Sequence, residues 1–284
     1  MATVIQGRIR DLDGFSVNRI LPNSGKKMVG PFIFLDHMGP ADFAPGDGID
    51  VRPHPHIGLA TITYLLEGSL LHRDSLGNQL EILPGDVNWM TAGRGIVHSE
   101  RETLETKAAP HRLNGMQAWV ALPQAQAEIA PSFSHIKRSE LPHFIREGVQ
   151  MRLIVGEACG MSSPIKSYSP MFYLDVLARA GSIVERPNPE QECMVYLLDG
   201  SIRIDGIDYS SGALVLLDDE QQIEAISNCR ILLYGGEAWP QTPHIEWNFV
   251  SFSRERIEQA KADWQHQRFP KIPGDDAEYT PLPG

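Results

Sequence analysis

The chain has 284 residues, of which 42% are hydrophobic and 21% are charged, and its formal net charge is −11. This length and composition are typical of a folded protein of one large or two ordinary domains, which can bury a core without disulfides. The acidic balance argues against direct nucleic-acid binding, which needs a surface rich in Lys and Arg. The three cysteines are widely spaced and include no CxxC pair, so neither a disulfide framework nor a zinc knuckle is supported.

Membrane and targeting segments are not predicted either. No apolar run approaches the ~20 residues of a membrane span. The first ten residues are mixed polar and lack the apolar core of a signal peptide. We therefore expect a soluble cytoplasmic protein with no membrane association.

The first half of the chain carries short segments rich in β-branched and aromatic residues, which predict strands separated by Gly and Pro turns. Residues 14–21 are typical of a strand, and 31–38 form an apolar run. Residues 39–53 are punctuated by Gly and Pro and are predicted to be a loop. Further strands are expected over residues 59–66, 79–83, 87–91, 96–100 and 114–123. Because no long helix interrupts them, an antiparallel sandwich or barrel is indicated.

The second half repeats part of this pattern. Residues 124–167 are less regular and are expected to be a connector with some strands of its own. Residues 64–69 read Tyr-Leu-Leu-Glu-Gly-Ser, and residues 196–201 read Tyr-Leu-Leu-Asp-Gly-Ser. Pro-Gly-Asp at 84–86 has a counterpart in Ser-Gly-Ala at 211–213. This weak internal repeat predicts two copies of one β-barrel unit.

The C-terminus changes character and predicts a helix. Ser253 is a suitable cap for a helix over residues 254–267, and Pro270 ends it. Ile257, Ala260 and Trp264 fall on one helical face, which we expect to pack against the protein. The predicted fold is therefore all-β, with a short C-terminal helix. Its domains are a metal-binding barrel, a barrel without metal ligands, and a helix with an extended tail, over residues 1–125, 126–240 and 241–284.

Two pairs of polar residues bracket the strand at 59–66. His54 and His56 are two residues apart, as are His98 and Glu100. Because side chains alternate across a strand, each pair would point to one face. Pro55 cannot donate to a sheet ladder, which indicates a sheet edge or a barrel mouth. If the two faces meet inside a barrel, they form a site for Fe, Mn, Co, Ni, Cu or Zn, and an octahedral ion would keep two positions open for O2 and a substrate oxygen.

A simpler interpretation stays open, because histidine has many uses besides metal binding. His37 and His72 either lie near the site or occupy turn or surface positions. Arg94 and Glu67 are expected in turns, and Cys193 as a small core side chain.

The second copy offers no equivalent ligands. Upstream of its Tyr-Leu-Leu, residues 187–190 read Pro-Asn-Pro-Glu and contain no histidine. Residues 218–221, Asp-Asp-Glu-Gln, contain no His-x-Glu pair. A single metal site is therefore predicted, in the first copy.

Several motifs, taken in order, resemble the pirin family of the cupin superfamily. They include Pro-His-Pro-His at 53–56, Trp-Met-Thr-Ala-Gly-Arg-Gly at 89–95 and His-Ser-Glu at 98–100. The other matching segments are residues 32–37, 64–68, 84–86, 117–123 and 268–275. The resemblance covers nearly the whole chain and is most specific in the first half.

The resemblance implies a bicupin, with two antiparallel jelly-roll β-barrels face to face and one metal in the N-terminal barrel. By motif position, the family's ligands fall on His54, His56, His98 and Glu100. Iron is the usual metal of the family. Some members resemble quercetin 2,3-dioxygenases, which open a flavonol ring with O2 and release carbon monoxide. Others act as transcriptional co-regulators or as partners of metabolic enzymes.

We therefore expect a monomeric Fe(II)-dependent dioxygenase acting on a small aromatic, flavonol-like substrate. Glu100 would be its catalytic residue, as a metal ligand or as acceptor of the substrate proton. The alternative is a metal- or redox-sensitive regulatory protein that binds a transcription factor or a metabolic enzyme without turnover. A zinc hydrolase or isomerase on the same barrel is a third interpretation.

Overall fold

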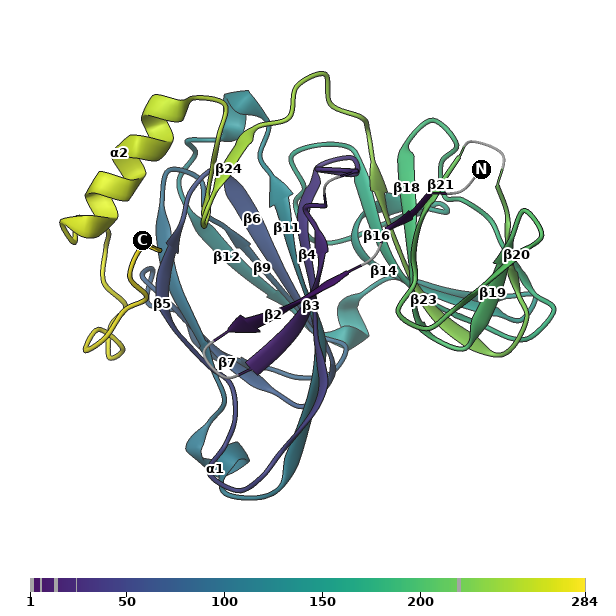
Figure 1. The fold of residues 1–284 in the computed structure, drawn as a ribbon, viewed down its shortest axis with the longest axis horizontal. Helices are drawn as coiled ribbons and strands as arrows, with labels where there is room; N and C mark the ends of the chain where they lie inside the picture. The colour runs from purple at the N-terminus through teal and green to yellow at the C-terminus, as the bar shows by residue number, and fades with distance from the viewer. Residues whose placement is uncertain (1–2, 6, 13–14, 24, 219–220, 284) are drawn as a thin grey trace. The chain divides into compact units, whose positions relative to one another are not determined.

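The structure, a computed structural model, describes residues 3–5, 7–12, 15–23, 25–218 and 221–283 (Figure 1). Two sequence predictions fall partly outside these ranges. They are the strand start expected at residue 14 and residues 219–220, which belong to the segment 218–221. The chain forms two compact units. The first unit comprises Ile9–Arg19, Phe34–Arg138 and Gln241–Gly284, and the second comprises Met1–Arg8, Ile20–Ile33 and Ser139–Pro240.

The first unit is built on a larger and a smaller sheet. The larger sheet has the strand order β12-β9-β6-β11-β4-β3-β2, and the smaller has β5-β10-β7-β8. The larger sheet contains β2 (Arg8–Leu12), β3 (Phe15–Leu21), β4 (Phe32–Phe43), β6 (Leu59–Glu67), β9 (Val87–Thr91), β11 (His111–Ala121) and β12 (Ser132–Ile136). The smaller sheet contains β5 (Asp50–His56), β7 (Leu70–Asp74), β8 (Gln79–Ile82) and β10 (Ile96–Arg101).

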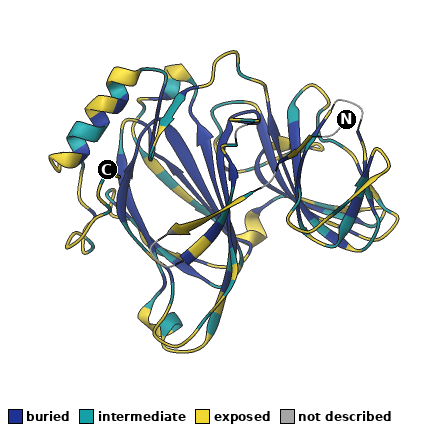
Figure 2. Ribbon diagram, viewed as in Figure 1, coloured by how far each residue is buried: buried dark blue, intermediate teal, exposed yellow. Residues whose placement is uncertain are grey.

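The strand β6 lies inside the larger sheet and is buried along nearly its whole length. Figure 2 shows buried residues in dark blue, and they follow most of the strands. A strand that is buried on both faces needs apolar or small side chains at successive positions, which its sequence LATITYLLE supplies. Gly58, directly before β6, has φ +69°, and a Cβ there would lie 2.0 Å from the Val250 carbonyl oxygen. Glycine therefore permits the close approach of the C-terminal strand β25 (Phe249–Ser251).

The second unit repeats the two-sheet plan. Its strand orders are β1-β21-β18-β23-β16-β14-β13, with β15 paired to β14, and β17-β22-β19-β20. The larger sheet contains β1 (Thr3–Ile5), β13 (His143–Arg146), β14 (Val149–Ala158), β15 (Met161–Ser162), β16 (Met171–Ala178), β18 (Glu192–Asp199), β21 (Leu214–Leu217) and β23 (Cys229–Gly236). The smaller sheet contains β17 (Ile183–Val184), β19 (Ser201–Ile204), β20 (Ile207–Ser210) and β22 (Ile223–Ala225). An apolar cluster that includes Val195, Ile223 and Leu233 fills the space between them.

Helical structure is confined to short segments. The helix α2 (Arg254–Gln265) begins at its cap Ser253, whose hydroxyl accepts a hydrogen bond from the Arg256 amide. Its buried residues are Ile257, Ala260 and Trp264, so the predicted helix and its packing face are confirmed. The remaining short elements are α1 (Leu104–Lys107), η1 (Gln124–Gln126), η2 (Arg138–Glu140) and β24 (His244–Glu246). Neither α-helix of the described chain combines the length and apolar character needed to cross a membrane.

The all-β prediction is confirmed, but two expected irregular segments contain more strand than anticipated. The strand β4 continues to Phe43, and β5 begins at Asp50, so the predicted loop at 39–53 is reduced to its middle. The expected connector at 124–167 holds the ten-residue strand β14. The predicted domain limits at 125/126 and 240/241 stay a prediction.

Candidate metal centre

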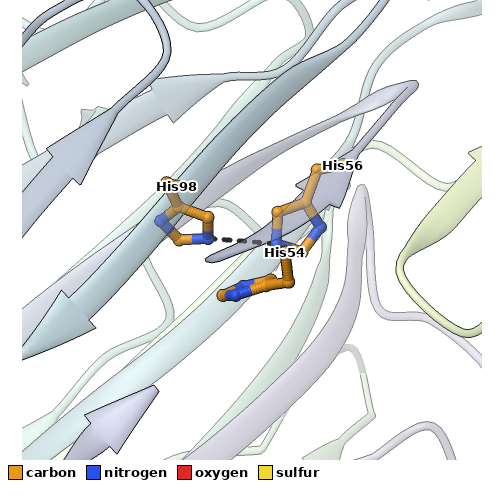
Figure 3. Close-up of side chains that lie close together, drawn as sticks. All are labelled: His54, His56 and His98. Atoms are coloured by element: carbon orange, nitrogen blue, oxygen red, sulfur yellow. Dashed lines mark hydrogen bonds between the residues drawn. The ribbon is translucent and has the colours of Figure 1, made fainter. Parts of the chain in front are cut away.

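Three histidines converge between two neighbouring strands of the first unit. Strands β5 and β10 pair antiparallel, and their register places His98 opposite His54 and Ile96 opposite His56. Possible ligand atoms of His54, His56 and His98 all lie within 4.8 Å of one another, and all three side chains are buried. Figure 3 shows the three imidazoles pointing toward one another. Strand alternation therefore predicted the facing of the His54–His56 pair correctly.

Backbone carbonyls orient two of these imidazoles. His54 Nδ1 lies 2.9 Å from the Arg52 carbonyl oxygen, and His56 Nδ1 lies 3.2 Å from the Asn248 carbonyl oxygen. A carbonyl only accepts, so each Nδ1–H donates, and the lone pair of a neutral ring stays on Nε2. Such an outer hydrogen bond commonly fixes the tautomer and ring direction of a metal-binding histidine.

The nitrogen lone pairs of the cluster are not all satisfied by the protein. His56 Nε2 lies 3.1 Å from His98 Nε2. His98 Nδ1 is buried and has no hydrogen-bond partner in the described chain. Burial lowers the pKa of His54 to about 4 and holds the pKa of His56 and His98 well below the usual value, so all three are neutral near pH 7. Buried neutral imidazoles with unpaired nitrogens fit a divalent transition metal.

Glu100 follows His98 on β10 and is also buried, but it is not part of the three-histidine group. Its carboxylate accepts hydrogen bonds from Thr63 Oγ1 at 2.9 Å and from Gln117 Nε2 at 3.2 Å. Burial raises its pKa, against the opposing effects of His72, Thr63 and Gln117. The β5–β10 register shifts between His98 and Glu100 because β5 holds one extra residue there, whereas the β10–β7 register is regular, so Glu100 stays in alternation with Ser99 along β10. Its assignment as a metal ligand stays a prediction.

The two histidines that the sequence left open have different surroundings. His72 on β7 is buried, with its ring centroid 5.6 Å from that of His98, and it stacks on Phe133. Its Nε2 lies 3.1 Å from Asp74 Oδ2. His37 on β4 instead lies within hydrogen-bond distance of the Asn114 side chain, at 2.8 Å. His72 is therefore next to the histidine cluster.

Aromatic side chains border the cluster. The Trp119 ring lies edge-on to His56, with centroids 5.0 Å apart. Phe34 stacks on Trp119 at 3.9 Å and 11°, and the Arg19 guanidinium lies 4.5 Å from the Phe34 centroid. Sequence reasoning gave Trp119 no role, although it lies two residues after Gln117 and so faces the same side of β11.

The remaining singled-out residues have structural roles. Arg94 is exposed, and its carbonyl oxygen accepts a hydrogen bond from Arg256. Glu67 is exposed at the end of β6, and Cys193 belongs to the apolar core of the second unit. Arg94 and Cys193 occupy the turn and core positions expected for them, whereas Glu67 is the last residue of a strand and not a turn residue.

Comparison with known proteins covers both halves of the chain. Residues 14–120 match the family model described as Pirin, and residues 173–270 match the Pirin C-terminal cupin domain. A pirin-like protein of Caulobacter vibrioides is 47% identical over 288 residues, covering 99% of this chain and 98% of the relative.

Solved structures have the same fold. A quercetin 2,3-dioxygenase from Acinetobacter baumannii matches with a TM-score of 0.91 at 34% identity, covering 100% of this chain and 95% of the other. The Escherichia coli pirin YhhW, solved in complex with nickel(II), matches with a TM-score of 0.67 at 20% identity, covering 84% of this chain and 100% of the other. At that identity the second likeness shows the fold alone.

Proposed function

The chain belongs to the pirin family of bicupin proteins, and on this premise we propose that it is a metal-dependent dioxygenase that opens the ring of a quercetin-type flavonol with O2. The observation that carries the proposal is the group of three buried, neutral histidines, His54, His56 and His98. The similarity to the quercetin 2,3-dioxygenase structure supports the same reaction class. When bound, the metal, which we propose to be Fe(II), would lower the pKa of a coordinated substrate hydroxyl and orient it toward O2.

Glu100 supplies the acidic side chain of the site. The hydroxyl of Thr63 and the amide of Gln117 hold its carboxylate in place. In that position we propose that Glu100 completes the ligand set or accepts the proton that the substrate hydroxyl releases. Both roles need an oriented carboxylate, which these two donors provide.

The aromatic residues suit a planar substrate. Trp119 lies edge-on to the His56 ring, and Phe34 stacks face to face on Trp119, so the two rings form an aromatic surface beside the cluster. A flavonol ring system can pack against such faces, with offset or edge-to-face contacts. We propose that this surface positions the substrate beside the three histidines and keeps water away from the reacting carbon atoms.

Anaerobic reconstitution with Fe(II), followed by quercetin and O2, tests the proposal. We expect loss of the flavonol absorbance, with one carbon monoxide released for each O2 consumed. His56→Ala, treated identically, is the matched control and should leave quercetin unchanged. A fully metal-loaded wild-type protein that does not consume quercetin would contradict the dioxygenase proposal and favour a regulatory protein that binds a partner without turnover.

A further inference from the structure

The C-terminal segment of the first unit follows the free edge of the ligand-bearing strand β5, as the yellow end of the chain shows in Figure 1. The Thr280 amide donates to the Pro53 carbonyl at 2.8 Å, and its hydroxyl donates to the Arg52 carbonyl at 3.3 Å. The Arg52 carbonyl is also the acceptor that orients His54. The segment therefore touches the group that sets the direction of one imidazole.

The same segment orients a second imidazole directly. The Asn248 carbonyl that accepts from His56 Nδ1 comes from a residue 192 positions further along the chain. The neighbouring Val250 amide donates to the Ile57 carbonyl at 3.1 Å, which fixes this stretch beside the end of β5. The tautomer of His56 therefore depends on the C-terminal segment as well as on β5.

Asp275 holds the other ligand-bearing strand from its outer face. Ser99 Oγ donates to Asp275 Oδ2 at 2.6 Å, and Arg101 donates to both carboxylate oxygens through Nε and Nη2, each at 3.0 Å. Ser99 and Arg101 alternate along β10 with His98 and Glu100. Because side chains alternate across a strand, Asp275 contacts the outward residues on either side of Glu100.

Arg101 extends this connection to both strands. It forms an ion pair with Asp50, its register partner at the start of β5, and donates to Glu278 at 2.9 Å. The side chains of Arg101 and Asp275 are only 14% and 11% exposed, so solvent screens their fork-like pair less than a surface pair. Ile272, three residues before Asp275, is buried against a core cluster that includes Val97 and Trp264.

We propose that Asp275 is a positioning residue of the metal centre. By holding Ser99 and Arg101, it fixes β10 against β5 and so sets the spacing between the two ligand pairs. On β5, the Asn248 carbonyl orients His56, and Thr280 donates to the Arg52 carbonyl that orients His54. The inference rests on the proposed metal centre and adds to it a function for the C-terminal segment.

Metal affinity of the full-length chain tests this role with Co(II) as the probe. Competition with a chelator gives the dissociation constant, and the visible absorption of bound Co(II) reports its ligand geometry. Losing an outer partner of a metal ligand typically weakens binding roughly 10- to 100-fold. We expect Asp275→Ala to weaken Co(II) binding by roughly tenfold and to alter the spectrum, and Asp275→Asn to have a smaller effect on both.

Asp276→Ala is the matched control, because this neighbouring carboxylate is 54% exposed and its ion pair is with Lys271, at 3.8 Å. We expect wild-type affinity and an unchanged spectrum for it. A purely structural role for Asp275 would lower the unfolding temperature but leave the Co(II) spectrum of the folded protein as in the wild type.

The outcomes separate the inference from the function on which it rests. A wild-type chain that does not bind Co(II) would overturn the metal centre itself. Wild-type binding that Asp275→Ala matches in affinity and spectrum would overturn only the positioning role. If Asp275→Ala fails to fold, Ser99→Ala removes a single hydrogen bond to Asp275. An unchanged affinity and spectrum in the folded Ser99→Ala protein would then overturn the inference.

Discussion

The interiors of the two units differ at matching positions of the same strand pattern. The repeat aligns Tyr64 of β6 with Tyr196 of β18, so Thr63 corresponds to Val195. In the first unit Thr63 lies opposite Gln117, and in the second Val195 lies opposite Leu233. Thr63 and Gln117 donate to Glu100, whereas Val195 and Leu233 belong to an apolar core.

The smaller sheets show the same replacement. Counting from the repeat places Ile204 of β19 at the position of His72 in β7. Glu100 lies opposite His72, and the β19–β22 register, continued by one residue, sets Ile223 opposite Ile204. A buried carboxylate needs donors around it, and removing the carboxylate removes the need for them. The exchange of a polar site for a packed core therefore involves several positions together.

Of the substitutions compared between the two units, His56→Ala should have the largest effect on bound metal. It removes a member of the histidine cluster without touching the apolar strands, so the fold should persist while bound metal is lost. The loss should exceed the roughly 10- to 100-fold cost of removing an outer partner. Metal content per chain and circular dichroism check this. Arg203→Ala, at an exposed ion pair of the second unit, should leave metal content unchanged, and a loss there would contradict the single-site comparison.

Leu233→Ala tests the second interior. Leu233 is fully buried in the apolar cluster, and truncation of such a side chain typically lowers the free energy of unfolding by about 2–5 kcal/mol. Denaturant unfolding measures the change. Metal content should equal that of the wild type, and reduced metal in the folded variant would show that the second interior supports the site.

Metal removal should lower the local stability of the first unit and leave that of the second unit unchanged. A ligand at 100 times its dissociation constant stabilises the folded state by about 2.7 kcal/mol. Hydrogen exchange with and without a chelator measures where this protection lies. We expect faster exchange in β5 and β10 after chelation and no change in β17 and β22. Equal changes in both pairs of strands would contradict a metal site confined to the first unit.

Residue alternation and the internal repeat were enough to predict the fold class and the common facing of His54 and His56. The His54–His56 pair was predicted from a spacing of two on an expected strand, which is a local property. Ser253 and the Trp264 face likewise predicted α2 from local capping and periodicity. Pro-Asn-Pro-Glu at the matching position predicts that the second copy lacks these ligands, and this stays a prediction.

Features that depend on distant contacts were not predictable in this way. The register shift opposite His98 and Glu100 arises from the pairing of β10 with β5; Pro53 is compatible with a bulge in β5 but does not fix its position. The Asn248 carbonyl and the Asp275 carboxylate contact the site only through tertiary packing. Strand β4 runs through Gly39 and Pro40, where composition alone indicated a loop.

A reciprocal exchange of Thr63 and Val195 provides the finest test of the comparison, because the two side chains are nearly equal in size. Among the described residues, Thr63→Val leaves Gln117 as the remaining side-chain donor to Glu100, and metal affinity should fall by roughly tenfold. Val195→Thr buries a hydroxyl among apolar neighbours and should cost about 1–3 kcal/mol of unfolding free energy. Chelator competition and denaturant unfolding measure the two effects. Because metal affinity should change only in the first variant, an equal loss in Val195→Thr would show that these matching positions do not separate a site from a core.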